Sequence, residues 1–236
     1  MTRLCFISDT HELHAQLTQS IAAARPDVLV HCGDFTGIGA LPAVRSFADW
    51  CAMLVAKGYA GQVVCIAGNH DLSFDQTHPK SNPAIAATAR AILAGAGITY
   101  LQDSDAEIEG LAFWGSPWTR RFYDWAFQID TPAQDEAIHE RIPLGVDILV
   151  THGPPCGIRD LVPRGEHIGS EALANHGAAR HPRIHAFGHY HGGYGITLGA
   201  AEHRNGARTL HVNASTCTEA YKPTNQPIVV DLESDE

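Results

Sequence analysis

No apolar run in the chain approaches the roughly 20 residues that a membrane-spanning helix needs. The N-terminus also lacks the basic region, apolar stretch and small-residue cleavage site that mark a secretory signal. The cysteines show no CxxC spacing, and Cys5, Cys32 and Cys65 lie in predicted strands. We therefore expect a cytoplasmic protein with reduced core cysteines and no membrane partner.

Positive charge is scarce as well. The chain holds 16 Lys and Arg against 26 Asp and Glu, which gives a formal net charge of -10 at pH 7. Affinity for long nucleic acid comes mainly from lysines and arginines that meet phosphates. The composition therefore argues against a partner of that kind and favours a small substrate.

The fold class follows from the order of the expected elements. Strands and helices alternate in the first half, which favours parallel pairing, whereas consecutive strands in the second half favour a second, mixed sheet. With 236 residues, 44% of them hydrophobic, and no repeat or long linker, we expect one α/β domain over residues 1–236, as a monomer or homodimer. Its two packed mixed β-sheets would be flanked by helices. We expect strands at 3–8, 27–32, 62–67, 147–151, 183–187, 208–213 and 227–232, extended segments at 98–101 and 106–114, and helices at 12–24, 41–57, 83–95, 132–141 and 169–179.

Five short segments carry metal-binding or acid-base side chains beside a glycine or a turn, and each directly follows an apolar run. Polar residues at one strand exit are typical of an ordinary turn, but five such exits indicate one site at one edge of a sheet. The segments are Asp9-Thr10-His11, Gly33-Asp34, Gly68-Asn69-His70-Asp71, Thr151-His152-Gly153 and Gly188-His189-Tyr190-His191.

The residue types in these segments are those of a two-metal hydrolase. Asp34 adds a carboxylate able to bridge two ions, because its two oxygens carry about four lone-pair positions. Seven candidate ligands exceed the needs of one tetrahedral ion and suit two ions about 3.5–4 Å apart. Taken singly, Asp9 or Asp34 would be interpreted as a helix cap or turn residue. The occurrence of ligand-type residues in five such segments argues against that interpretation. The ligands are Asp9, His11, Asp34, Asn69, His152, His189 and His191. Of the ten histidines outside these five segments, His14, His78, His139 and His203 among them, most are expected at the surface, and a position near the site stays open for His31 and His78.

In this order, the motifs resemble those of the calcineurin-like metallophosphoesterases. Further segments, including Gly115-Ser116-Pro117-Trp118-Thr119 and Asn213-Ala214-Ser215-Thr216-Cys217, are similar to the metallophosphoesterase-domain-containing subgroup. The resemblance implies a four-layer αββα sandwich. It also implies a metal-dependent phosphohydrolase in which a metal-bridging hydroxide attacks phosphorus.

The resemblance further implies a role for each site residue. The first metal ion would be bound by Asp9, His11, Asp34 and His191, and the second by Asp34, Asn69, His152 and His189. His70 would contact the scissile phosphate or protonate the leaving oxygen, and Asp71 would orient His70. Mixed oxygen and nitrogen ligands accept manganese, iron, zinc, cobalt or nickel, of which we favour manganese.

We expect phosphodiesters, including cyclic nucleotides, as substrates. This preference rests on the subgroup and on the aromatic stretch from Trp114 to Phe127, in which Trp118, Arg120 and Phe122 would wall the pocket. Arg159 is a further candidate for substrate binding. Two structural explanations compete with substrate binding. The aromatic residues could form a loop that packs over the sheet, and Arg159 could form an ion pair within its own loop. A phosphomonoesterase for a small metabolite or phosphoprotein and a non-catalytic nucleotide-binding protein are the functional alternatives.

Overall fold

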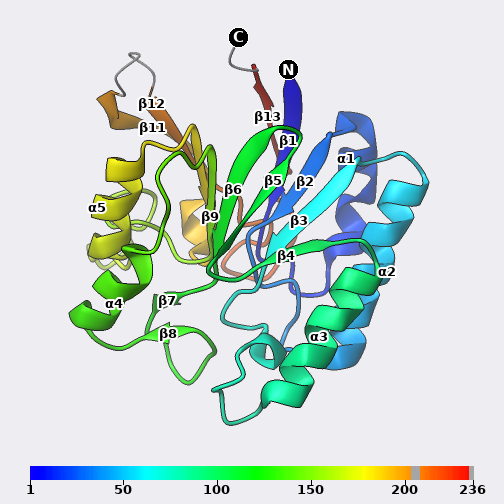
Figure 1. The fold of residues 1–236 in the computed structure, drawn as a ribbon, viewed down its shortest axis with the longest axis horizontal. Coiled ribbons are helices and arrows are strands. Elements are labelled where there is room, and N and C mark those ends of the chain that lie inside the picture. Colours follow the sequence, from blue (N-terminus) through cyan, green and yellow to red (C-terminus); the bar gives the residue numbers. More distant parts are fainter. Residues whose placement is uncertain (203–207, 234–236) are drawn as a thin grey trace.

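Four parallel strands form most of the first sheet, and the last strand of the chain joins its edge. The computed structural model describes residues 1–202 and 208–233 (Figure 1). The strand order is β13-β1-β2-β3-β4, with β13 antiparallel to β1 and the other pairs parallel. The strands are β1 Thr2–Ile7, β2 Val28–His31, β3 Gln62–Ile66, β4 Thr99–Leu101 and β13 Ile228–Leu232.

The second sheet has six strands in the order β11-β12-β10-β9-β6-β5. Its four inner strands are parallel to one another, and each outer strand is antiparallel to its neighbour. The strands are β5 Ser104–Ile108, β6 Leu111–Ser116, β9 Ile148–Thr151, β10 Ile184–Phe187, β11 Gly195–Glu202 and β12 Arg208–Asn213. A short parallel pair, β7 Thr119–Arg120 and β8 Gln128–Ile129, lies apart from both sheets.

Helices cover the outer face of each sheet, so the predicted four-layer sandwich is confirmed. Figure 1 shows α1, α2 and α3 beside the first sheet, and α4 and α5 beside the second. Their bounds are α1 Thr18–Ala24, α2 Leu41–Ala56, α3 Pro83–Gly95, α4 Pro132–His139 and α5 Glu171–Arg180. Within the described residues, no helix is both long and apolar enough to cross a membrane.

The alternating side-chain directions along β1 place its residues in two different core layers. Successive side chains of a strand point to opposite faces. Leu4 and Phe6 accordingly join the cluster between the two sheets, whereas Cys5 and Ile7 join the cluster under α1, α2 and α3. All six cysteines are unpaired, and five of them are buried.

The expected helix at 12–24 is wrong in its first part. Glu12 has a left-handed φ of 68°, so the chain turns there and continues as a 3₁₀ segment, His14–Leu17, before α1 begins. The strands β7, β8 and β11 were not predicted. The pair β7 and β8 is only two residues long in each strand, too short for an alternating pattern to emerge.

The expected surface position of the remaining histidines is also wrong for several of them. His14, His31, His78, His139 and His185 are all buried. His31 and His185 lie inside strands, and each ring has a threonine partner, Thr10 and Thr151 respectively. A satisfied imidazole packs in a core as a flat, largely apolar side chain. His203 lies outside the described residues.

Candidate metal centre

Backbone hydrogen bonds connect the loop after β1 to the loop after β2, and several residues of the site have left-handed φ angles. Asp9 N–H donates to Gly33 O at 2.9 Å, and His11 N–H donates to Asp34 O at 3.0 Å. The φ angles are 51° at Asp9, 42° at His11, 58° at Asp34 and 65° at His189. Such values are uncommon outside glycine, and four of those in this chain fall on residues of the candidate site.

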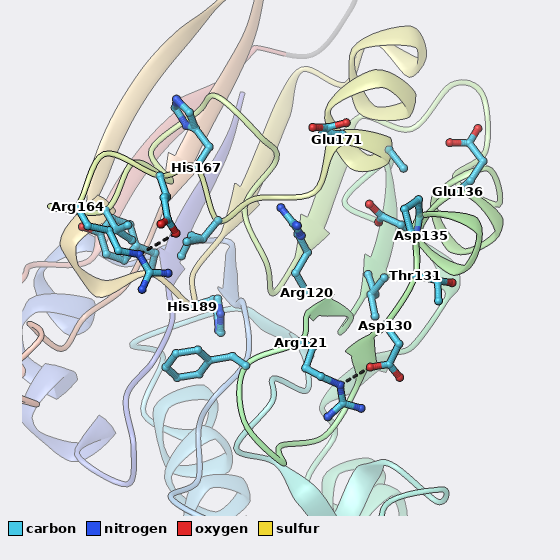
Figure 2. A pocket seen from close by; sticks show the side chains of 18 of the residues that line it. Arg120, Arg121, Asp130, Thr131, Asp135, Glu136, Arg164, His167, Glu171 and His189 are labelled. Atoms are coloured by element: carbon cyan, nitrogen blue, oxygen red, sulfur yellow. Dashed lines mark hydrogen bonds and ion pairs between the residues drawn. The ribbon is translucent and has the colours of Figure 1, made fainter.

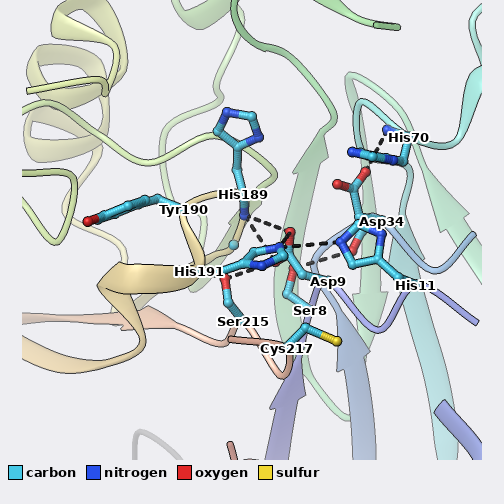
Figure 3. Close-up of polar contacts among 12 residues, drawn as sticks. Ser8, Asp9, His11, Asp34, His70, His189, Tyr190, His191, Ser215 and Cys217 are labelled. Carbon is cyan, nitrogen blue, oxygen red and sulfur yellow. Dashed lines mark hydrogen bonds and ion pairs between the residues drawn. The ribbon is translucent and has the colours of Figure 1, made fainter. Parts of the chain in front are cut away.

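Asp9, His11 and His191 form a first group of facing donor atoms. Each offers one ligand atom, and these atoms lie within 4.8 Å of one another. The Nε2 atoms of His11 and His191 are 3.3 Å apart, and His191 Nε2 lies 3.4 Å from an oxygen of Asp9 (Figure 3). The loops after β1 and β10, 180 positions apart in the chain, thus converge on one point.

A second group lies around His152. Its Nε2 atom is 3.4 Å from Asp34 Oδ2 and 2.8 Å from Asn69 Oδ1, which also lies 2.8 Å from His189 Nδ1. Asp34 belongs to one cluster with Asp9 and His152 and to another with His11 and His70. Asp34 is therefore close to histidines from both sides of the site.

The donor set fits divalent cations. Asp9 and Asp34 are 0% and 2% exposed, so each carboxylate needs compensation by positive charge or hydrogen bonds. His11 Nδ1 is buried without a hydrogen-bond partner among the described residues, and its Nε2 faces another imidazole nitrogen. Two carboxylates, an amide oxygen and imidazoles are ligands that first-row divalent metals accept.

Hydrogen bonds from outside the cluster fix the orientation of its members. His152 Nδ1 bonds Cys32 O and His191 Nδ1 bonds Thr218 O, each at 2.9 Å, which leaves each Nε2 toward the site. Ser215 Oγ donates to Asp9 Oδ2 at 2.9 Å (Figure 3). A Cβ at position 68 would overlap the Asp34 carboxylate, so only glycine fits there.

Charge within the cluster keeps the carboxylates ionised. Burial raises the pKa of Asp34, but the nearby imidazoles, His152 first among them, lower it to well below its ordinary value. Burial and the neighbouring charge of His152 lower the pKa of His189 to about 4. His189 is therefore neutral at physiological pH, which is the form in which an imidazole ligates a metal.

His70 lies beside the cluster but is not oriented by Asp71. Its backbone N–H donates to Asp34 Oδ1 at 2.7 Å, and its Nδ1 lies 2.8 Å from the carbonyl oxygen of Gly37. The Asp71 carboxylate accepts hydrogen bonds from the backbone N–H groups of Asp34, Thr36 and Gly68 and from the Thr36 hydroxyl. The predicted role of Asp71 is wrong in this respect, because both of its oxygens face the loops that carry Asp34 and Gly68.

Two aromatic residues that the sequence did not single out contact the site. Trp125 stacks on His70, with ring centroids 3.9 Å apart. Tyr221 lies 4.9 Å from His11 and 5.2 Å from His191, and 52% of it is exposed. Trp125 lies within the aromatic stretch that was noted, whereas nothing in the local sequence marks Tyr221.

The aromatic stretch divides into a packed part and an open part. Trp118 donates its indole N–H to Asp103 at 2.9 Å and packs edge-on against Phe127, as the structural alternative expected. Phe122 is 52% exposed, and its ring lies 6.1 Å from that of His189. Of these two candidates for substrate binding, the structure brings Phe122 to the site and uses Trp118 in packing.

Arg159 supports the backbone of a neighbouring loop. Its guanidinium donates to the carbonyl oxygens of Gly193, Tyr194 and Ile196. The expected ion pair with Asp160 is absent from the described residues, since Asp160 instead pairs with His167 at 2.6 Å. The guanidinium of Arg159 is thus bound to backbone carbonyl oxygens, and its predicted role in substrate binding has no geometric support.

A cavity of about 1030 Å³ opens next to the cluster. His189 and Tyr190 form one end of its lining, and residues of α4 and α5, including Asp135 and Glu171, contribute to the other. Arg120 also lines this cavity (Figure 2). The candidate metal centre is therefore continuous with a space large enough for an organic group.

Comparison with known proteins identifies sequences that share this pattern. The family model described as calcineurin-like phosphoesterase matches residues 2–193. Metallophosphoesterase domain-containing protein 1 of Homo sapiens is 38% identical over 251 residues, covering 98% of this chain and 71% of the relative. The Mus musculus protein of the same name gives the same values.

Solved structures share the fold at low sequence identity. The protein TT1561 of Thermus thermophilus superposes with a TM-score of 0.59 at 9% identity, covering 98% of each chain. The phosphopantetheinyl hydrolase of Mycobacterium tuberculosis gives a TM-score of 0.51 at 15% identity, covering 89% of each chain. At these identities the similarity concerns the fold alone.

Proposed function

The chain belongs to the calcineurin-like phosphoesterase family, and we propose that it hydrolyses small phosphodiesters, cyclic nucleotides among them, at two divalent metal ions. Family membership and the clusters of ligating side chains make it a metal-dependent phosphoesterase. The observation that carries the proposal is the place of Asp34, which shares one cluster with His11 and another with His152. A carboxylate so placed suits a bridge between two ions.

Each ion would have four ligands from this chain. Asp9, His11, Asp34 and His191 would hold the first, and Asp34, Asn69, His152 and His189 the second. When bound, the ions would supply Lewis acidity, which lowers the pKa of water toward neutrality and stabilises negative charge on the phosphate oxygens. The mixed donor set accepts several metals, and manganese is our first choice for reconstitution.

His70 would deliver the proton to the leaving oxygen. A carbonyl oxygen only accepts hydrogen bonds, so the 2.8 Å contact with Gly37 O requires a proton on His70 Nδ1. A second proton on Nε2 would then be available for the departing alkoxide. Histidine is the side chain that most often acts as a general acid in enzymes.

Exposed aromatic rings on two sides of the cluster favour a diester over a monoester. Phe122 borders His189, while Tyr221 borders His11 and His191. A diester carries an organic group on each side of its phosphorus, and each group would meet one ring. A monoester would leave one of the two rings unused.

A substrate panel tests the proposal. Protein of residues 1–236, which we take as a single cytoplasmic domain, would be reconstituted with manganese and assayed against monoesters, linear diesters and cyclic nucleotides. We expect kcat/KM to be highest for diesters, with Asp34→Ala, which should lose both ions, as the inactive control. Higher kcat/KM for monoesters would establish the monoesterase alternative. Nucleotide binding without turnover under any divalent metal would establish the non-catalytic one.

A further inference from the structure

The cavity beside the metal centre is larger than a scissile phosphate requires. Its volume of about 1030 Å³ lies at the upper end of the ~300–1000 Å³ usual for small-molecule sites. It runs from His189 and Tyr190 past β7 to the first turns of α4 and α5. A remote part of the substrate therefore has room beyond the reacting group.

Most charged side chains that line this cavity are already neutralised. Arg121 forms an ion pair with Asp130, and Arg164 lies 2.8 Å from Glu166. Figure 2 shows the first of these pairs at the cavity wall. In each pair the carboxylate offsets the positive charge that would otherwise attract an anionic ligand.

Arg120 differs from both. Among the described residues, its one hydrogen bond is to Gly169 O at 3.3 Å, and no carboxylate lies within ion-pair distance of its guanidinium. A guanidinium carries five N–H donors, so most of its donor capacity is unused. In Figure 2 the Arg120 side chain points into the cavity, between His189 and the acidic residues of the far wall.

The acidic residues of that wall are engaged elsewhere or face water. Asp135 accepts the Ser170 hydroxyl with both of its oxygens, at 2.7 and 2.8 Å, and Glu136 lies 2.7 Å from His176. Glu171 is exposed, where solvent screens its charge. Arg120 is exposed as well, but among the described residues its guanidinium has no ion-pair partner and is open to a ligand in the cavity.

We propose that Arg120 forms a subsite for a second phosphate group of the substrate, carried on the part of the molecule that extends past Phe122. The proposal rests on the proposed function in one respect, that the scissile phosphate lies at the metal centre. The planar fork of arginine matches phosphate oxygens bidentately. Arg120 is two residues from Phe122, whose ring lies 6.1 Å from His189, and all three residues line the same cavity. A nucleotide with phosphates at its 3' and 5' positions would present one phosphate to the metal centre and the other to Arg120.

Calorimetric titration of the manganese-reconstituted protein tests this subsite. We expect thymidine 3',5'-bisphosphate to bind on the order of 10- to 100-fold more tightly than thymidine 5'-monophosphate, the value of a charged hydrogen-bonded contact. Arg120→Gln should abolish this ratio. Arg164→Gln is the matched control, because it removes the same charge from the same cavity but from an existing ion pair, and it should preserve the ratio.

Three results would overturn the subsite: equal affinity for the two ligands, a ratio that survives Arg120→Gln, or an equal loss in both variants, which would indicate only a long-range charge effect. Hydrolysis is measured separately, with the p-nitrophenyl ester of thymidine 5'-monophosphate. If that ester is stable with every divalent metal while the binding ratio is intact, the proposed diesterase function fails and the subsite stands.

Discussion

The indole of Trp125 stacks on the imidazole of His70, with centroids 3.9 Å apart and an angle of 26° between the planes. Gly37 O fixes the same imidazole through Nδ1 at 2.8 Å. One contact sets the plane of the ring and the other sets its rotation. Together they direct Nε2, the atom that we propose as the proton donor.

Replacement of His70 itself should separate proton donation from metal binding. We expect His70→Ala to retain metal and to lose about 10²–10⁴-fold in kcat for alkyl esters, the usual contribution of a positioned general acid. Nitrophenyl esters should lose much less, because their leaving oxygen needs no proton. An equal loss with both classes would assign His70 to phosphate positioning instead.

Removal of the stacking ring should produce a weaker form of the same effect. Trp125→Ala should lower kcat for alkyl esters on the order of 10-fold, since His70 would sample other rotamers, and Trp125→Phe should recover most of it. The readout is the ratio of kcat values for alkyl and nitrophenyl esters. A ratio unchanged from wild type would show that Gly37 O alone positions His70.

The bridge assignment predicts unequal metal losses. Asp34→Ala should lose both ions after dialysis, whereas Asn69→Ala should retain about one ion per chain, as measured by elemental analysis. Asp130→Ala removes a carboxylate that is ion-paired with Arg121, outside these clusters, and should retain both ions. One ion bound at full activity in the unmodified protein would contradict the two-ion assignment.

Phe122 and Trp118 should respond oppositely to truncation. Phe122→Ala should raise KM for a cyclic nucleotide about 5- to 150-fold, which corresponds to stacking worth 1–3 kcal/mol, with little change in melting temperature. Trp118→Ala should lower the melting temperature by several degrees, because it loses the bond to Asp103 and the packing on Phe127. Both variants would be measured with a cyclic nucleotide and a nitrophenyl diester; parallel KM changes on both substrates for Phe122→Ala would exclude base stacking.

The contact between α4 and α5 should weaken in acid. Burial raises the pKa of Asp135, but hydrogen bonds from His139 and Ser170 outweigh it, so the pKa lies below its ordinary value. A lowered carboxyl pKa stabilises the folded state above the unfolded value of about 3.9, and this stabilisation disappears as pH falls through the folded value. Urea unfolding should therefore show wild type more stable than Asp135→Asn at pH 6, with the difference reduced at pH 3. A constant difference between the two pH values would assign the effect of the substitution to packing.

The sequence by itself determined the layers and the strand ends that carry the motifs, whereas the packing of the two sheets brought Asp34 and His152 together. Alternation in segments such as Leu4 to Ile7 specifies which side chains enter which cluster, because the period of a strand is fixed by its backbone. The carboxyl ends of parallel strands in one sheet share an edge, so Asp34 after β2 and Asn69 after β3 had to lie on one side of the first sheet. That reasoning needs only local patterns and the rules for connecting strands.

Only the tertiary structure decided which residues each side chain of the site contacts. Asp71 binds the loops of Asp34 and Gly68, although it follows His70 directly in the chain. Tyr221 reaches His11 from more than 200 positions away. Within the part of the chain that the structure describes, Arg120 has no carboxylate partner, while the adjacent Arg121 has one. Such pairings depend on loop paths and rotamers settled by the packing of the whole chain, and a contact between distant residues leaves no periodic trace in the sequence.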